Sequence, residues 1–121
     1  INEIDYIIPL PLHWRRKLKR GFNQSEIIAK TIGKYFSKEV KSNYIRRVRN
    51  NRSQTKMSKS QRWTNVENIF KLKNPALLEG KHILLVDDIV TTGASLNSCI
   101  KTLSKVKDIK ISVLVLGQTN H

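Results

Sequence analysis

Cysteine is almost absent from this sequence of 121 residues, in which Cys99 is the only one. A single cysteine excludes an internal disulfide and a cysteine-based metal site within the chain. Long apolar runs are also absent: none approaches the ~18 residues that cross a bilayer, and no signal-peptide pattern is present. The sequence therefore predicts one globular domain over residues 1–121, cytoplasmic and without membrane insertion.

Acidic residues are the second shortage, since 9 Asp and Glu stand against 23 Lys and Arg and leave a formal net charge of +14. The imbalance lies in residues 14–62, which carry 16 basic residues and two acidic ones. Such an asymmetry favours a polyanionic partner, which could be a nucleic acid, an anionic lipid or a phosphorylated ligand. A solvated basic surface is the plainer alternative, although the concentration of Arg argues against it.

Strand and helix patterns alternate along the chain, which predicts an α/β fold with a mostly parallel sheet and flanking helices. The predicted strands are 5–10, 44–48, 82–86 and 111–116, the stretch 64–73 is predicted to form a turn and a short strand, and the predicted helices are 24–38 and 94–105. Uninterrupted apolar character predicts that strands 82–86 and 111–116 are buried. The first helix should start at an Asn23–Glu26 capping signal and face the sheet with Ile28, Ile32, Tyr35 and Phe36. Cys99 falls on the apolar face of the second helix as a small core residue.

The segment ILLVDDIVTTGAS, residues 83–95, places two neighbouring acids after the clearest strand. Ligands of parallel α/β sheets bind beyond the carboxyl ends of the strands, and the start of the next helix favours an anion. Gly93 allows close approach of the backbone, and nearby hydroxyls can donate to a phosphate. Because carboxylates repel phosphate, Asp87 and Asp88 should face vicinal hydroxyls or a metal ion, so a ribose 5-phosphate would satisfy both halves of the site. A receiver-type metal site, or an acid that merely caps the turn, would not explain the Thr-Thr-Gly-x-Ser pattern.

This segment resembles, over all 13 residues, the phosphoribosyl pyrophosphate (PRPP) motif of type I phosphoribosyltransferases. The resemblance implies that Asp87 and Asp88 are the catalytic acids, which hold the ribose hydroxyls with magnesium bound nearby and indirectly. It also implies that five residues wrap the 5-phosphate: Thr91, Thr92, Gly93, Ala94 and Ser95.

Two further segments resemble the ComF family of competence proteins. PLPLHWRRKLKRGFNQSEIIAK is similar to its loop after the first core strand, and RVRNNRSQTKMSKSQRWTNVENIF is similar to its mobile-loop region. The resemblance implies basic and mobile loops at about 14–22 and 49–62. Residues assigned to the pyrophosphate side are Arg16, Lys19, Arg20 and Gly21, and those assigned to the mobile loop are Gln54, Lys56 and Arg62. Judged from the residues alone, these loops could equally be solvated, disordered or bound to nucleic acid.

The family implies a glycosyltransferase of the phosphoribosyltransferase type, linked to natural competence and DNA uptake, with an unknown acceptor. Members of the ComF family carry an N-terminal zinc-binding cysteine cluster and a segment before the first core strand. This sequence has neither, so we expect part of the acceptor-side hood to be missing. Thr91 stands where purine-salvage members place an acid, so no base toward an acceptor can be assigned.

Two alternatives to catalysis remain open from the sequence. The basic bias together with Trp14 and Trp63 would suit a module that binds single-stranded DNA. A PRPP sensor would bind the same ligand without turnover. A homodimer is compatible with either reading.

Overall fold

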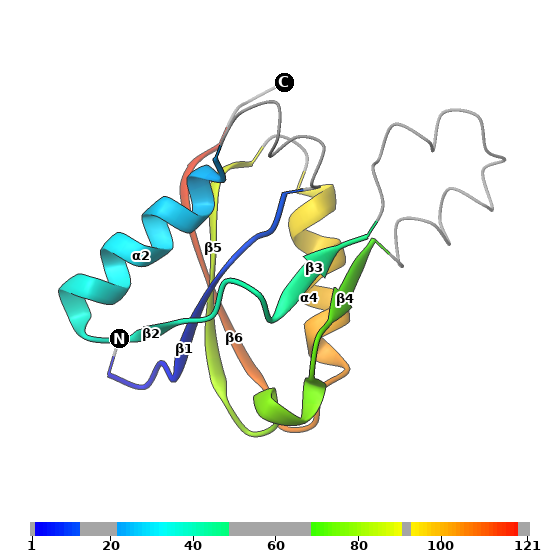
Figure 1. Cartoon of the computed structure of the whole chain (residues 1–121). Helices are drawn as coiled ribbons and strands as arrows, with labels where there is room; N and C mark the ends of the chain where they lie inside the picture. Colours follow the sequence, from blue (N-terminus) through cyan, green and yellow to red (C-terminus); the bar gives the residue numbers. More distant parts are fainter. Residues whose placement is uncertain (1, 13–21, 49–68, 91–92, 119–121) are drawn as a thin grey trace, which may run out of the picture.

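The protein is described by a computed structural model that covers residues 2–12, 22–48, 69–90 and 93–118. A parallel four-stranded sheet in the order β2-β1-β5-β6 forms its centre, with helix α2 on one face and α4 on the other (Figure 1). The strands of this sheet are β1 (Tyr6–Pro9), β2 (Glu39–Val40), β5 (His82–Val90) and β6 (Lys110–Gln118). The other elements are α2 (Gln24–Phe36), α4 (Ala94–Ser104), β3 (Ile45–Arg47), β4 (Phe70–Leu72) and the short 3-10 helix η2 (Pro75–Leu78). The predicted α/β fold with flanking helices is confirmed.

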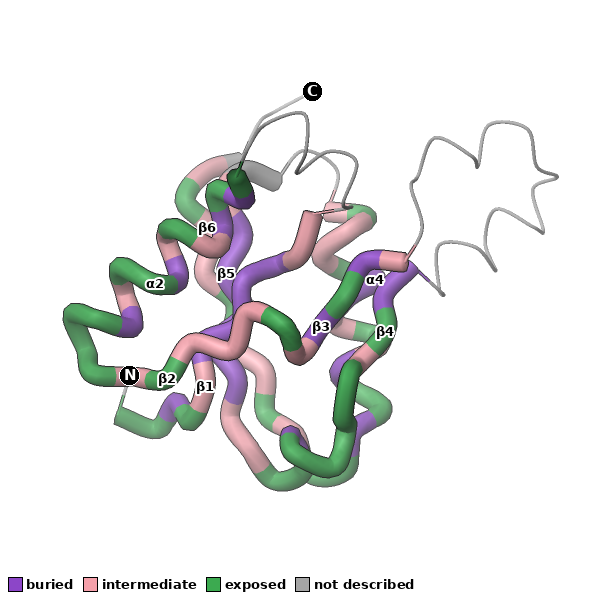
Figure 2. The backbone as a smooth tube through the Cα atoms, viewed as in Figure 1, coloured by how far each residue is buried: buried purple, intermediate pink, exposed green. Residues whose placement is uncertain are grey.

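Strand β5 is the buried centre of the sheet (Figure 2). Ile83 and Leu85 pack on the α4 side, in the same cluster as Cys99 and Leu103. Leu84 and Val86 pack on the opposite face, against α2. Alternating side chains of one strand thus supply both halves of the core, as expected for a strand covered on both faces.

Helix α2 begins where the sequence predicts, because the Asn23 side chain caps it by accepting a hydrogen bond from the Ser25 N–H at 3.1 Å. Glu26 carries a negative charge in the first turn, which the helix dipole favours, and it pairs with Lys30 one turn later at 3.0 Å. The helix ends at Phe36, just short of the predicted end, because Ser37 takes a left-handed conformation with φ 55°.

The predicted sheet-facing side of α2 is partly wrong. Ile28 and Ile32 pack on the core, but Tyr35 is 82% exposed and Phe36 is 44% exposed. The two aromatic rings contact each other instead, at a centroid distance of 4.8 Å. The buried line of the helix consists of the small residues Ser25, Ala29 and Gly33.

Small side chains on that line let the helix lie close to the sheet. A Cβ atom on Gly33 would lie 2.5 Å from Cγ2 of Val40 and 2.8 Å from the backbone oxygen of Lys38. No side chain fits there without a shift of the β2 region. Large residues at the helix end are therefore turned outward, although their spacing matches a helical face.

Strand β6 corrects a second expectation, that 111–116 is a fully buried strand. It is longer than predicted and pairs with β5, and no other strand in the described parts of the chain pairs with its far side. Val113 is 41% exposed and Leu116 is 64% exposed. A continuous apolar run does not distinguish an edge strand from a central one, because both need one well-covered face.

Strands β3 and β4 confirm the strand predicted at 44–48 and the short strand predicted within 64–73, and they form a separate antiparallel pair beside α4 (Figure 1). Ile45 and Phe70 are buried in the core cluster on the α4 side. A hydrogen bond of 2.7 Å from the Val48 N–H to the Ile69 oxygen brings together the two ends that flank residues 49–68. Within the described ranges, every helix falls short of the length and apolar character that a membrane span requires.

Candidate functional site

The carboxyl ends of the central strands and the beginnings of both helices lie at the same edge of the molecule (Figure 1). Strand β1 ends at Pro9, which pairs with Val86, while β5 continues to Val90. The predicted strand end at Val86 is therefore too early. Asp87 and Asp88 belong to the part of β5 that extends beyond β1 and, among the described strands, has β6 alone as a neighbour. This extension places both acids at the edge where ligands of parallel sheets bind.

Asp87 is a buried carboxylate, only 8% exposed. One of its oxygens, Oδ1, accepts hydrogen bonds from the Ser25 hydroxyl at 3.4 Å and from the Asp88 N–H at 2.9 Å. Burial is the main cause that raises the pKa of Asp87 from 3.8 to about 6. The neighbouring Asp88 carboxyl contributes to this rise, and the hydrogen bonds from the Asp88 N–H and from Ser25 oppose it. Among the described residues, its negative charge is therefore only partly compensated.

The start of α4 takes the form that the motif predicts. Gly93 caps the helix with φ 79°, a left-handed conformation that favours glycine. Ala94 is exposed and Ser95 is half-buried in the first turn, and the Asn97 N–H closes that turn on the Gly93 oxygen at 2.8 Å. The helix dipole gives this end of α4 a partial positive charge that suits an anion.

Arg47 is a residue of this region that the sequence analysis missed. It is 6% exposed, although it belongs to β3 and not to the central sheet. Its Nη2 donates to the Ser95 hydroxyl at 2.9 Å, and its guanidinium carbon lies 5.5 Å from the centre of the Phe70 ring. Strand alternation was the available signal, because Ile45 and Arg47 share the buried face of β3 while Arg46 is exposed.

The pKa of the buried Cys99 thiol is affected by both Asp87 and Arg47. Burial raises the pKa of Cys99 to about 12; the negative charge of Asp87 adds to the rise and the positive charge of Arg47 opposes it. Cys99 thus lies within electrostatic reach of both groups, from beneath the first turns of α4. Its predicted role as a small core residue is confirmed.

Ser25 is the other residue that the sequence analysis did not single out. It lies in the first turn of α2, and its hydroxyl reaches Asp87 across the sheet. The capping signal at Asn23 located the helix start, but only the topology brings that start next to the carboxyl end of β5. The Asn23 amide also donates to the Leu10 oxygen at 3.2 Å, which fixes the end of β1 against the same helix start.

Several predicted site residues lie outside the described residues, so their arrangement stays a prediction. They are Arg16, Lys19, Arg20, Gly21, Gln54, Lys56, Arg62, Thr91 and Thr92. The chain leaves the candidate edge at the end of β1 and returns to it at the start of α2, on either side of residues 13–21.

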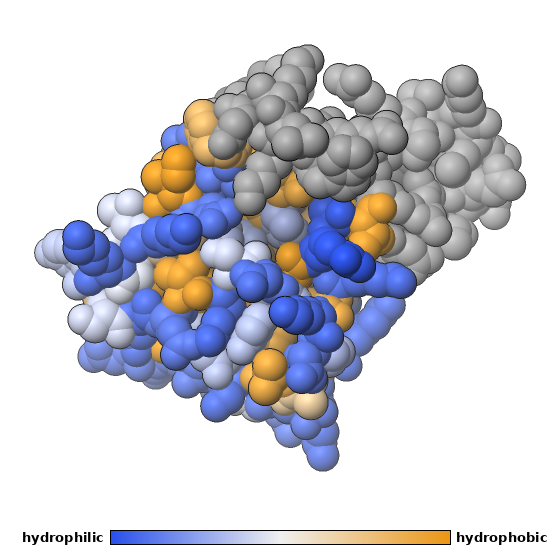
Figure 3. Space-filling view, in the orientation of Figure 1, coloured by the Kyte–Doolittle hydropathy of each residue, from blue (hydrophilic) through white to orange (hydrophobic). Residues whose placement is uncertain are grey.

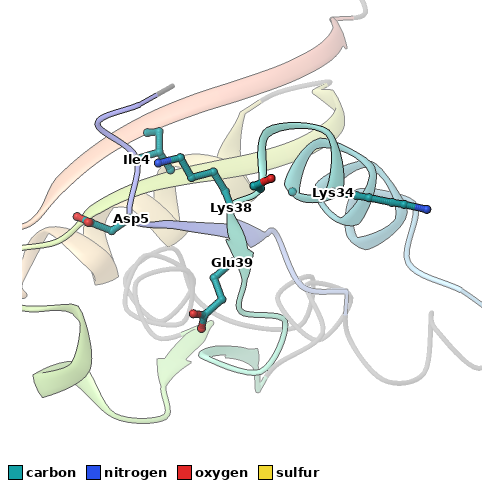
Figure 4. Close-up of a pocket in the computed structure, with 7 residues that line it drawn as sticks. Ile4, Asp5, Lys34, Lys38 and Glu39 are labelled. Atoms are coloured by element: carbon teal, nitrogen blue, oxygen red, sulfur yellow. The ribbon is translucent and has the colours of Figure 1, made fainter.

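A separate depression of about 580 Å³ lies at the opposite end of the sheet (Figure 4). It is lined by residues just before β1, at the end of α2 and at the start of β2, including Asp5, Lys34, Lys38 and Glu39. Because the strands are parallel, this end holds amino termini and is remote from Asp87. The face shown in Figure 3 is mainly hydrophilic with scattered apolar residues.

No group of three or more His, Cys, Asp or Glu that could enclose a metal ion occurs among the described residues. The two acids at the end of β5 suit a different kind of site. Magnesium is commonly held by one or two carboxylates together with the phosphates of a substrate and water. Asp87 and Asp88 offer hard oxygen atoms and incompletely compensated charge, so the residues present fit magnesium bound together with a substrate.

Residues 18–120 match the model of the phosphoribosyl transferase domain. The chain belongs to this family. It is 33% identical over 115 residues to the DNA utilization protein YhgH of Escherichia coli O157:H7, covering 95% of this chain and 50% of that protein.

Competence proteins are also among the relatives of this phosphoribosyl transferase domain. Competence protein F of Haemophilus influenzae is 33% identical over 115 residues, with 93% of this chain and 49% of that protein covered. Competence protein ComFC of Bacillus subtilis is 34% identical over 111 residues, with 91% and 43% covered. The chain thus spans about half the length of the curated relatives it matches, and the resemblance to the ComF family is confirmed.

Proposed function

We propose that this domain binds PRPP together with magnesium and transfers its phosphoribosyl group to an acceptor. The observation that carries the proposal is the buried Asp87 beside Asp88 at the carboxyl end of β5, next to the glycine-capped start of α4. Membership of the phosphoribosyl transferase family supports the class of reaction.

The two acids would hold the ribose. Vicinal hydroxyls of the sugar donate hydrogen bonds, and a carboxylate can accept several, so Asp87 can accept from the sugar as well as from Ser25 and the Asp88 N–H, which both donate to Oδ1. As the bond to pyrophosphate breaks, the ribose gains positive charge, which two fixed carboxylates stabilise without reorganisation. Ser25 would keep Asp87 oriented through its hydrogen bond, so that the carboxylate faces the sugar in one geometry.

The turn from Thr91 to Ser95 would bind the 5-phosphate. Gly93 allows the backbone to approach the ligand, and the start of α4 supplies N–H donors and a favourable dipole. Thr91, Thr92 and Ser95 add hydroxyl donors. The phosphate would thereby anchor one end of the substrate while the acids hold its ribose.

The basic loops would bind the pyrophosphate. After β1, Arg16, Lys19 and Arg20 would supply positive charge and Gly21 a backbone N–H donor. The segment with Gln54, Lys56 and Arg62 would close over the substrate. Cations in these places stabilise the leaving group as its charge develops. Magnesium, when bound, would neutralise pyrophosphate oxygens near Asp87 and Asp88. Thr91 offers no carboxylate toward the acceptor, so the acceptor is left unassigned.

The test is calorimetric titration with PRPP, with and without magnesium. The proposal predicts binding that depends on magnesium and is lost in an Asp87→Asn/Asp88→Asn variant. Asp108→Asn is a matched control, because Asp108 is an exposed acid near the amino end of β5, at the opposite end of the strand from Asp87, and its φ of 55° suits Asn. A folded wild-type protein that shows no PRPP binding with magnesium would overturn the proposal. Pyrophosphate release on adding candidate acceptors separates a transferase from a PRPP sensor.

Binding of single-stranded DNA is a second candidate, favoured by the excess of 16 basic over two acidic residues in 14–62 and by relatives named for DNA utilization and competence. Its signature would be affinity that falls by roughly 0.7 log units per log unit of salt for each phosphate contacted. Such binding should survive the Asp87→Asn/Asp88→Asn substitution. Loss of DNA binding in that variant, or an affinity indifferent to salt, would count against this function.

A further inference from the structure

Arg47 connects two parts of the fold that are distant in the sequence. It belongs to β3, directly before residues 49–68, and its side chain ends at Ser95 in the first turn of α4. Only 6% of the residue is exposed, so its charge is poorly screened by solvent. An arginine stays protonated at any physiological pH, and it carries donors only.

The direction of the Arg47–Ser95 hydrogen bond fixes what Ser95 can do. Because the guanidinium has only N–H groups at its surface, the Ser95 oxygen must be the acceptor. The hydroxyl proton of Ser95 is then left for another acceptor. A hydroxyl that accepts from a cation becomes a stronger donor, because hydrogen bonds in a chain polarise one another.

We propose that Arg47 is a positioning residue for the 5-phosphate: it holds the Ser95 oxygen and directs the Ser95 hydroxyl proton toward a phosphate bound at the start of α4. The inference rests on the proposed function, since it takes that phosphate to belong to PRPP. It adds a coupling that the motif around Gly93 does not contain. The contact links β3 to the first turn of α4, two elements that are far apart in the sequence.

The decisive experiment compares Arg47→Met with Arg46→Met in titrations with PRPP, ribose 5-phosphate and magnesium pyrophosphate. Both substitutions remove one arginine charge from the same strand, but Arg46 is exposed and Arg47 is buried. We expect Arg47→Met to weaken the binding of PRPP and of ribose 5-phosphate about tenfold, which corresponds to the loss of one charge-assisted hydrogen bond. Pyrophosphate binding should be unchanged, and Arg46→Met should leave the ratio between ribose 5-phosphate and pyrophosphate affinities unchanged.

A double-mutant cycle with Ser95→Ala separates positioning from a general effect on the fold. If Arg47 acts through Ser95, the double variant binds ribose 5-phosphate no more weakly than Ser95→Ala alone. Should Arg47→Met not fold, Arg47→Lys replaces it, because it keeps the charge but lacks the planar guanidinium; most of the loss should remain.

The failures of the two proposals differ. The role of Arg47 is overturned if the wild type binds PRPP but the losses of ribose 5-phosphate affinity in the cycle are additive. It is also overturned if Arg47→Met weakens the binding of pyrophosphate as much as that of ribose 5-phosphate. Either result leaves the proposed function standing. Wild-type affinity for ribose 5-phosphate in a folded Arg47→Lys or Arg47→Met variant does the same. A folded wild type that binds no PRPP overturns both.

Discussion

Replacing Asp87 by Asn should make the protein more stable while removing its ligand binding. The folded state raises the pKa of this carboxyl from 3.8 to about 6, chiefly because the group is buried. Each pKa unit corresponds to about 1.36 kcal/mol, so the ionised carboxylate costs the fold up to ~3 kcal/mol at pH 7.5. Partial access of solvent reduces this figure, and we expect a gain of about 1–2 kcal/mol in the variant. Asn keeps an oxygen that can accept from Ser25 and from the Asp88 N–H, so these contacts survive.

The sign follows from the raised pKa. Between pH 3.8 and about 6 the folded protein keeps the proton of Asp87 while the unfolded chain has lost it, so the wild-type free energy of unfolding falls as the pH rises through this window. Above about pH 6 Asp87 is ionised in the folded protein as well, and the free energy of unfolding falls no further from this cause. The Asp87→Asn variant lacks this pH-dependent loss of stability, so the two proteins should have similar stabilities near pH 4 and differ most above pH 7.

Urea denaturation of both proteins from pH 4 to pH 8, in the presence of a chelator, measures the difference. The control is Asp108→Asn, which removes an exposed acid and should follow the wild type at every pH. A variant that is less stable than the wild type at pH 7.5, or one with the same pH dependence, would refute the reasoning. The expected result would mean that the site is maintained at the expense of stability, as is common for functional residues.

Three further predictions concern the surroundings of the site. Gly33→Ala should lower the free energy of unfolding by about 1–2 kcal/mol, because the clash with Val40 outweighs the higher helix propensity of Ala, whereas Ala at the exposed Lys34 should change it by under ~0.5 kcal/mol in the same urea titration. Gly93→Ala should lower the free energy of unfolding by about 1–2 kcal/mol, because φ is positive at this position, and should also weaken the binding of ribose 5-phosphate in calorimetry. An unchanged free energy of unfolding together with an unchanged affinity would contradict the requirement for glycine. Cys99 should react with a thiol reagent at pH 8 only as fast as the protein opens, since its pKa is raised to about 12; labelling at the rate of an unfolded peptide would disprove its burial.

The fold was predictable where periodicity and composition act locally. Uninterrupted apolar residues before Asp87 identified the central strand, and Asn23 located the start of α2, because capping chemistry needs only neighbouring residues. The order of strands and helices then sufficed for a parallel sheet. The acids were correctly expected at its carboxyl edge for the same reason.

The errors arose where the distance between elements decides the outcome. Tyr35 has the right spacing to face the sheet but lies outside, because the close approach of α2 at Gly33 leaves no room for a large side chain. Arg47 looked like one more cation in a basic segment, and only the packing of β3 against α4 shows its buried contact with Ser95. Such contacts join segments far apart in the sequence, and no local pattern encodes them.

The pairing of β1 with β5 has a consequence for the way the chain is made. Tyr6 pairs with Ile83, so β1 cannot pair with its central partner until the residues from Ile7 to Ile83 have been synthesised. At about 5–20 residues per second, a nascent chain spends several seconds with β1 lacking its main neighbour. During that time the two-residue strand β2 is the one described strand with which β1 can pair, and two short strands are too few for a stable sheet. We expect the ribosome-bound chain to gain protease resistance in one late step, after His82–Val90 has left the exit tunnel.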